Sequence, residues 1–180
     1  MKKEKRMKIN KKLLSLLLTV AMSISLLPAV ASPAYAASHT YHIDYGSITI
    51  SENALDSGYL DITFYASSGA SASSTDTILV SDDIVITQTN SGTSTTNTIT
   101  VSSGTANVTL KGVNVSTSSG SAFTISSGAT ANLTLSGANT LNTSATDCAG
   151  LQVQSRASLT SDKETSDTND SLTTAGGSRG

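Results

Sequence analysis

The sequence predicts an all-β fold, a right-handed parallel β-helix (solenoid) with about 24–28 residues per coil. Two observations support this prediction. A segment that begins at Ile99 recurs from Phe123 and, more weakly, from Leu151. Recurrence at this spacing is typical of stacked units, because one unit alone cannot bury its apolar face. Within each unit, apolar residues also occupy alternate positions, as in strands with one buried face.

Residues 1–36 are predicted to be a secretory signal peptide. A basic start precedes an apolar run from Leu13 to Val30, and Ala34 and Ala36 occupy the small-residue positions of an A-x-A cleavage site. This three-part order is that of an exported protein. The run is near the lower length limit of a membrane span. Serine and proline also interrupt it, so cleavage after Ala36 is favoured over a membrane anchor.

Removal of the leader leaves an acidic chain. It keeps four Lys and Arg residues and 12 Asp and Glu residues, a formal net charge of −8. This charge disfavours nucleic acid and anionic membranes as partners, since both require a basic surface. The single cysteine, Cys148, cannot form an internal disulfide. We therefore expect a secreted or cell-surface protein that leaves the membrane after cleavage.

Residues 37–98 are predicted to be an N-terminal cap with the first strands. Alternating patterns indicate strands at 43–51, 59–67 and 77–89, and the polar segment 88–97 indicates a loop. These segments repeat the downstream sequence poorly, as terminal units of repeat proteins usually do. The HTYH segment that follows the cleavage site is expected to be a mobile N-terminus with exposed histidines.

Residues 99–160 are predicted to be the repeats. Stacking would bring together these side chains: Val108 and Leu133, Leu110 and Leu135, and Val101 between Ile125 and Val153. It would also stack Asn107 on Asn132 and Asn114 on Asn139, so that their amides could form hydrogen bonds along the column. Corners are expected at five glycines, because glycine adopts positive φ without steric cost: Gly104, Gly112, Gly120, Gly128 and Gly137.

Residues 161–180 are predicted to be a polar, disordered tail, which suggests that the chain is a fragment of a longer protein. The competing fold is an antiparallel sandwich, whose strands would be joined by short hairpins. The sequence lacks the Asn-Gly and Asp-Gly pairs typical of such turns. A sandwich would also give no reason for the similarity between units, so the β-helix is favoured.

Three segments resemble a known group of proteins: 96–115, 123–141 and 148–153. They are similar to the carbohydrate-binding-domain (β-helix) region of secreted clostridial and other Firmicutes surface proteins. The resemblance covers roughly residues 84–175, and Arg156 departs from it by standing where a small turn residue is usual. It implies a polysaccharide or cell-wall glycan as partner. Two alternatives stay open: a passive structural stalk or adhesin repeat region, and a degenerate pectinase-like enzyme.

The sequence shows no set of catalytic residues. Glycoside hydrolysis needs two carboxylates on either side of the bond, and Asp82–Asp83 is the one adjacent acidic pair. Neighbours on a strand point to opposite faces, so these two would not converge. The NTD, GHG and RIK strings of pectin-cleaving β-helix hydrolases are absent as well. We therefore expect a non-catalytic protein.

Candidate ligand-binding residues are the aromatic and amide side chains Tyr59, Tyr65, Asn114 and Asn139. Tyr59 and Tyr65 could form an exposed aromatic patch for sugars, or they could pack within the cap. No cofactor is expected. If a metal binds, the sequence indicates calcium, with Asp82 and Asp83 as candidate oxygen ligands; the alternative is that both are solvated surface acids.

Overall fold

The computed structural model describes residues 36–164 and 169–178, and within these residues it contains 14 strands and no helix. The all-β prediction is confirmed. The predicted signal peptide lies, except for Ala36, outside the described residues. The described part of the chain has no helix long and apolar enough to cross a membrane.

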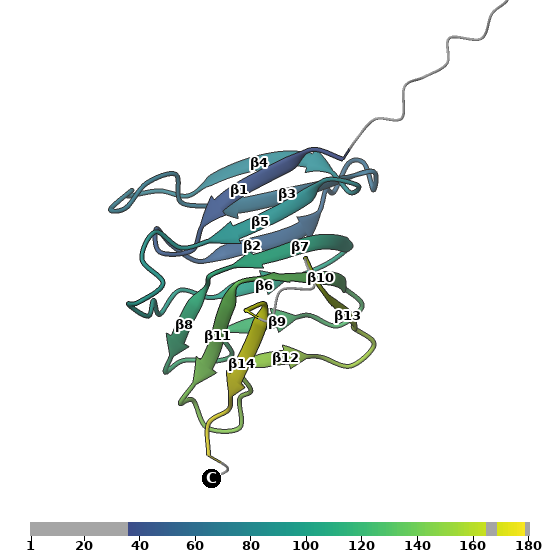
Figure 1. Ribbon diagram of the computed structural model, residues 1–180. Helices are drawn as coiled ribbons and strands as arrows, with labels where there is room; N and C mark the ends of the chain where they lie inside the picture. The colour runs from purple at the N-terminus through teal and green to yellow at the C-terminus, as the bar shows by residue number, and fades with distance from the viewer. Residues whose placement is uncertain (1–35, 165–168, 179–180) are drawn as a thin grey trace, which may run out of the picture. The chain divides into compact units, whose positions relative to one another are not determined.

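The strands form three separate sheets (Figure 1). The five-stranded sheet contains, in spatial order, β1 (Ser38–His42), β5 (Asp83–Thr87), β7 (Thr105–Lys111), β10 (Thr130–Ser136) and β13 (Ser158–Lys163). The six-stranded sheet contains β12 (Leu151–Val153), β9 (Phe123–Ile125), β6 (Ile99–Val101), β2 (Ile48–Glu52), β3 (Tyr59–Phe64) and β4 (Ser74–Leu79). The three-stranded sheet contains β14 (Ser171–Ala175), β11 (Ala138–Thr143) and β8 (Asn114–Thr117).

The prediction of a right-handed parallel β-helix is wrong for this chain. The strands lie in three separate sheets, and the six-stranded sheet is mixed because β3 is antiparallel to both β2 and β4. The reversal before β3 is made by local side chains. The Asn53 Oδ1 atom accepts hydrogen bonds from the backbone N–H groups of Leu55 and Asp56, and Asp56 accepts one from Gly58. Such Asx turns reverse a chain without a two-residue hairpin.

The registers between the repeated segments are largely those expected. Phe123 pairs in parallel with Ile99 on one side and with Leu151 on the other. Val108 pairs with Leu133, Leu110 with Leu135, and Asn107 with Asn132. One detail differs from the predicted order, because Ile125 is the middle residue between Val101 and Val153.

The predicted stacking of Asn114 on Asn139 is wrong by one residue. Asn114 pairs with Thr140, and Asn139 lies one position earlier in β11. The reason is local, because three residues (137–139) separate the paired positions Ser136 and Thr140, whereas two (112–113) separate their partners Lys111 and Asn114. Asn107 and Asn132 have the same sequence spacing as Asn114 and Asn139, but only the first two residues are register partners.

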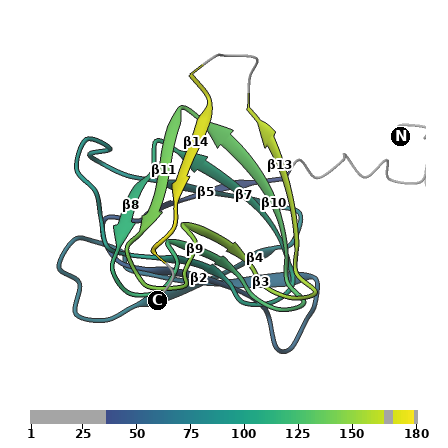
Figure 2. The ribbon, with the colours of Figure 1, turned by 90° about the horizontal axis from the view of Figure 1, so that it is seen from below.

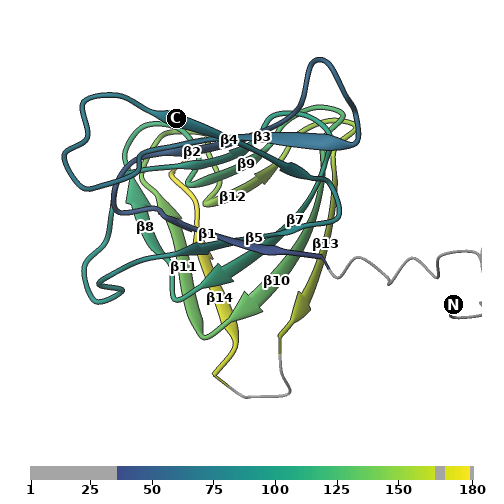
Figure 3. The same ribbon diagram turned by 90° about the horizontal axis from the view of Figure 1, so that it is seen from above.

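One apolar cluster fills the space between the sheets. Strands of all three sheets lie around it in the two views at right angles to Figure 1 (Figures 2 and 3). Its largest fully buried side chain is Phe123, which lies on β9 between Ile99 and Leu151. Inward residues alternate with outward polar ones along each strand, as in the BiBiBi part of β10. This alternation follows from the period of two in strands, and it gives each sheet one apolar face toward the core and one polar face toward solvent.

All five glycines predicted at corners have positive φ, between 64° and 83°: Gly104, Gly112, Gly120, Gly128 and Gly137. Arg156 takes up the same left-handed conformation, with φ 63°. A side chain in this region is strained. The departure of Arg156 from a small turn residue therefore coincides with a corner that glycine would fit better.

Both ends of the described region contain strands that the sequence did not predict. The HTYH segment forms β1, in which Tyr41 is 3% exposed, so the expectation of a mobile N-terminus is wrong. The region expected to be a disordered tail contains β14, whose Leu172 packs against the core. The predicted strand at 77–89 is divided into β4 and β5 by a turn at 80–82. The predicted loop at 88–97 contains one isolated bridge, Thr95 with Val115.

Candidate functional site

A row of threonines crosses the outer face of the six-stranded sheet. Register pairs join, in spatial order, Thr75, Thr63, Thr49, Thr100 and Thr124, and Gln152 ends the row. We call these five threonines the threonine row. Neighbouring strands are about 4.8 Å apart, so the row and Gln152 together extend about 24 Å across six strands. The residues on either side of each threonine within β2, β6 and β9 are buried apolar residues, which fixes the threonines on the outside.

The hydroxyl groups of the threonine row form no hydrogen bonds within residues 36–164 and 169–178. Thr49 and Thr75 are exposed, and Thr63, Thr100 and Thr124 are half-buried by their neighbours on the same face. A hydroxyl group can donate one hydrogen bond and accept two. The row therefore presents regularly spaced donors and acceptors to whatever lies against this face.

Tyr59 and Tyr65 lie on the same outward side of the chain as the threonine row, but not together. Tyr59 begins β3 and Tyr65 directly follows its last residue, which separates their backbones by about 20 Å at strand rise. Tyr59 is 38% exposed and pairs with Leu79, which is 42% exposed. The Tyr65 ring lies against Gly46, where a Cβ atom would overlap it. The two tyrosines therefore form no single patch, and Tyr59 is the more accessible.

Asp61 lies between these tyrosines, next to Thr63 on the outer face of β3. Its carboxylate accepts hydrogen bonds from Asn53 Nδ2 at 2.9 and 3.0 Å and from Thr77 Oγ1 at 2.7 Å. These hydrogen bonds lower the pKa of Asp61, and the bond from Asn53 has the larger influence. Desolvation opposes them with a smaller effect. The face of β3 thus carries a fixed negative charge beside neutral hydroxyls.

Asn114 and Asn139 are used inside the chain. Asn139 is 1% exposed; its Oδ1 accepts from the Val113 N–H at 2.9 Å, and its Nδ2 donates to the carbonyls of Ser136, Gly137 and Ser171. Asn114 is half-buried, and its Nδ2 donates to the Ser91 carbonyl at 2.9 Å. Both amides hold corners and loops together, which leaves Asn139 away from the surface.

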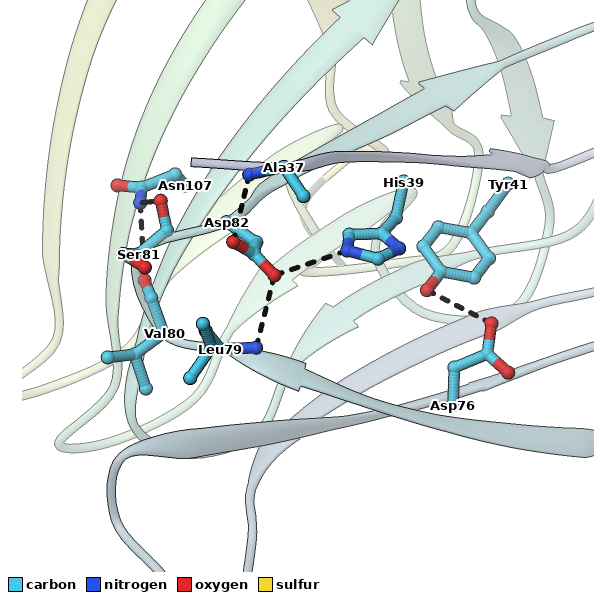
Figure 4. Close-up of polar contacts among 9 residues, drawn as sticks. All are labelled: Ala37, His39, Tyr41, Asp76, Leu79, Val80, Ser81, Asp82 and Asn107. Carbon is cyan, nitrogen blue, oxygen red and sulfur yellow. Dashed lines mark hydrogen bonds and ion pairs between the residues drawn. The ribbon is translucent and has the colours of Figure 1, made fainter. Parts of the chain in front are cut away.

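Asp82 is a buried carboxylate in the turn between β4 and β5 (Figure 4). Its oxygens accept hydrogen bonds from the N–H groups of Ala37 at 3.0 Å and Leu79 at 3.2 Å, and from His39 Nε2 at 3.2 Å. Desolvation is the largest single influence and opposes ionisation. The three hydrogen bonds and the charge of His39 together outweigh it and lower the pKa of Asp82.

Asp83 faces a different set of groups. Thr109 Oγ1 donates to its two carboxylate oxygens at 3.0 and 3.2 Å. Burial, the largest influence, raises the pKa of Asp83, the Thr109 hydrogen bond opposes this, and the charge of Glu164 adds to the rise. Asp82 and Asp83 share no side-chain hydrogen-bond partner within the described residues.

The donors around Asp82 do not fit a calcium site at this pair. N–H groups occupy the carboxylate oxygens that a cation would need, whereas calcium is held by six to eight oxygen ligands. Within the described residues, no three His, Cys, Asp or Glu side chains form a group that could hold a metal ion. The geometry of Asp82 is that of an anion held by donors.

The threonine row was not predicted from the sequence, although the sequence contains its signal. Four strands carry a threonine between two apolar residues: ITI at 48–50, ITF at 62–64, ITV at 99–101 and FTI at 123–125. Each triplet alone resembles any short strand with one buried face. Only the register, in which β3 runs antiparallel to β2, brings Thr63 and Thr75 into line with the others.

Comparison of the chain with protein-family models, curated proteins and solved structures finds no significant match. The resemblance to clostridial carbohydrate-binding-domain proteins therefore stays a prediction from the sequence.

Proposed function

We propose that this protein is a secreted, non-catalytic module that binds a polysaccharide or cell-wall glycan across the threonine row. The observation that carries the proposal is the set of five hydroxyls that have no partner in the described residues, aligned across one sheet. A polysaccharide is itself a regular array of hydroxyl groups, so repeated donors and acceptors at a fixed spacing complement it.

The surroundings of the row support a ligand that is polar and extended. Tyr59 offers part of its ring on the same face, and an aromatic ring presents an apolar surface with one polar end. Asp61 supplies a carboxylate, which accepts strong hydrogen bonds from hydroxyl groups. The face is a sheet surface, which suits a long chain that makes many weak contacts.

The carboxylates support a binding role over hydrolysis. Asp82 is buried among donors, and Asp83 is bonded to Thr109. A hydrolase needs two carboxylates on either side of one glycosidic bond, about 5–9.5 Å apart. These two engage separate partners and neither lies on the face of the threonine row.

The test is a pull-down of the secreted protein by insoluble polysaccharides, with cellulose, chitin, xylan and peptidoglycan as probes. The double variant Thr100→Val/Thr124→Val should bind the retained polysaccharide about tenfold more weakly, because two hydrogen bonds of about 0.7 kcal/mol each are lost. Its free energy of unfolding should change by less than about 0.5 kcal/mol. EDTA should leave binding unchanged.

The matched control is Thr134→Val, the same substitution on the outer face of the five-stranded sheet, where the hydroxyl also has no partner in the described residues. It should bind like the wild type. Equal loss of binding in both variants would remove the threonine row as the site. Retention by none of the four probes at millimolar concentration would favour the structural stalk, and release of reducing sugar would favour an enzyme.

A further inference from the structure

The residue that follows the predicted cleavage site is held in place by both of its backbone polar groups. The Ala37 N–H donates to Asp82 Oδ1 at 3.0 Å (Figure 4). The Ala37 carbonyl accepts a hydrogen bond from the Asp83 N–H at 2.8 Å. Ala37 directly precedes β1, the edge strand of the five-stranded sheet. Its nitrogen is therefore fixed beside a buried carboxylate.

The surroundings of the Asp82 carboxylate favour a positive charge at the Ala37 nitrogen. Asp82 is 5% exposed, and its second oxygen accepts from His39 Nε2 and from the Leu79 N–H, both at 3.2 Å. Within the described residues, the hydrogen bonds to the Asp82 carboxylate all come from nitrogen donors. A buried carboxylate is stable only when hydrogen bonds or an opposite charge compensate for its lost hydration. An amide N–H at this position satisfies one lone pair but supplies no charge.

We propose that cleavage after Ala36 creates an α-ammonium group on Ala37 that forms an ion pair with the Asp82 carboxylate and locks β1 onto the sheet. The inference rests on export of the chain, which is part of the proposed function, and is independent of glycan binding. The nitrogen already lies at hydrogen-bond distance, so the pair can form without movement of the strand.

The chemical step is hydrolysis of one peptide bond. Water adds across the bond between Ala36 and Ala37, catalysed by a signal peptidase of the exporting membrane. The Ala36 carbonyl carbon takes the hydroxyl and leaves as a carboxylate, and the Ala37 nitrogen takes the proton and becomes an amine, which is charged at neutral pH. One neutral donor is thereby replaced by an ammonium with three donors, and charge-assisted hydrogen bonds are the stronger ones.

The ion pair between Ala37 and Asp82 would stabilise the N-terminal end of the apolar core. β1 contributes Tyr41, which is buried, contacts Phe64 edge to face at 4.9 Å between ring centroids and bonds to Asp76 on β4. As an edge strand, β1 pairs with β5 alone. An ion pair at Ala37, directly before this strand, therefore opposes fraying of the strand that covers this end of the core.

The sign of the pH dependence follows from the charge of the amine. An opposite charge at this distance raises the pKa of an α-amine above its ordinary value of about 7.7–8.0. The added stability should be fully present at pH values below about 7.7 at which Asp82 is ionised, and should be lost as the pH rises through the raised value of the amine. The neighbouring titratable groups are Asp82 and His39 in the cluster, Asp83 with Glu164 on one side, and Tyr41 with Asp76 on the other.

To test this, the full chain is expressed in a secreting bacterium and the protein is purified from the medium. Its intact mass should correspond to a chain that begins at Ala37. Insertion of one glycine between Ala36 and Ala37 moves the ammonium one residue away and leaves an amide N–H beside Asp82. At pH 7 this insertion should raise the unfolding equilibrium constant about fivefold, which is in the range of partly exposed ion pairs.

The same insertion combined with Asp82→Asn should have no effect, since the ion pair is already absent, whereas combined with Asp83→Asn it should keep its fivefold effect. Acetylation of the Ala37 amine by acetic anhydride should also be slower in the folded wild type than in urea. A secreted chain that begins at another residue would overturn the inference. An insertion effect of equal size with and without the Asp82→Asn substitution would overturn it even where cleavage occurs after Ala36.

Discussion

Two rows of polar side chains cross the outer faces of two sheets, and they differ in how their hydrogen bonds are used. In the five-stranded sheet, Asn132 Nδ2 donates to Asn107 Oδ1 at 2.9 Å, and Thr160 Oγ1 donates to Asn132 Oδ1 at 2.8 Å. Asn107 Nδ2 continues the row to the Val80 carbonyl at 3.3 Å. The threonine row of the six-stranded sheet is aligned by register in the same way, but the described residues show no such bonds along it.

The difference lies in the reach of the side chains. An amide carries donors and an acceptor at the end of a side chain long enough to reach the next strand, about 4.8 Å away. A threonine hydroxyl is attached directly to Cβ, and among the described residues none in the threonine row bonds to the hydroxyl of the next strand, although Thr98 Oγ1, just before β6, donates to Ser47 Oγ at 3.4 Å. The asparagine row therefore stabilises the fold, while the threonine row leaves its hydrogen-bonding capacity for a ligand.

The largest effect is expected at Thr109, the paired threonine on β7. Thr109→Val removes the donor from the partly buried Asp83 carboxylate and should lower the free energy of unfolding by about 1.5–2 kcal/mol, as for other hydrogen bonds to charged groups. Thr124→Val, the same change in the threonine row, should alter it by less than about 0.5 kcal/mol. Urea unfolding at pH 7 measures both. Equal losses would contradict the distinction between paired and unpaired threonines.

A smaller effect is expected in the asparagine row. Asn132→Leu keeps a similar volume but leaves Asn107 Oδ1 and the Thr160 hydroxyl without their partner. The free energy of unfolding should fall by about 1 kcal/mol, since both groups are half-buried or exposed and water replaces part of the loss. Thermal unfolding checks this, and polysaccharide binding should be unchanged. Loss of binding in Asn132→Leu would mean that the five-stranded sheet contributes to the site.

The smallest effect concerns pH. Because burial and Glu164 raise the pKa of Asp83, the folded protein holds the Asp83 proton to a higher pH than the unfolded chain does. The stability that this proton supplies should be lost as the pH rises from about 3.9, the ordinary value for aspartate, through the raised value. The difference in unfolding free energy between wild type and Asp83→Asn should therefore decrease over this interval, with the wild type becoming relatively less stable.

Denaturant unfolding at several pH values between about 3.5 and 6.5 measures this difference. Thr109→Val should steepen the dependence, since the hydrogen bond that opposes the rise is then missing. A difference that stays constant with pH would show that Asp83 titrates alike in the folded and unfolded chain.

Local pattern was enough to predict the strands of the repeats, their pairing and their corners. The alternation of Val108 and Leu110 with polar residues defines an inward face, and the 24-residue interval from Ile99 to Phe123 sets the register. Positive φ at Gly104 and Gly128 follows from a property of glycine itself. These predictions depend on the period of a strand and on residues close in the sequence.

Local turns and contacts between distant segments together decided the rest. The Asx turn at Asn53 sends β3 back along β2, and this reversal makes the six-stranded sheet mixed and completes the threonine row with Thr63 and Thr75. β1 and β14 form because Tyr41 and Leu172 pack in or against the apolar core. The polar residues around them in the sequence do not indicate this packing. Similarly, one additional residue between the paired positions Ser136 and Thr140 placed Asn139 one position before the partner of Asn114.

Alternation and glycine corners are properties of short segments, so the all-β class, the repeated strands and most of their pairing could be predicted from the sequence. The division of the strands into three sheets, the open row of five threonines and the position of Asp82 beside the nitrogen of Ala37 became evident in the folded chain. Those features depend on how the strands are arranged in space, which the alternation of residues within one strand does not encode.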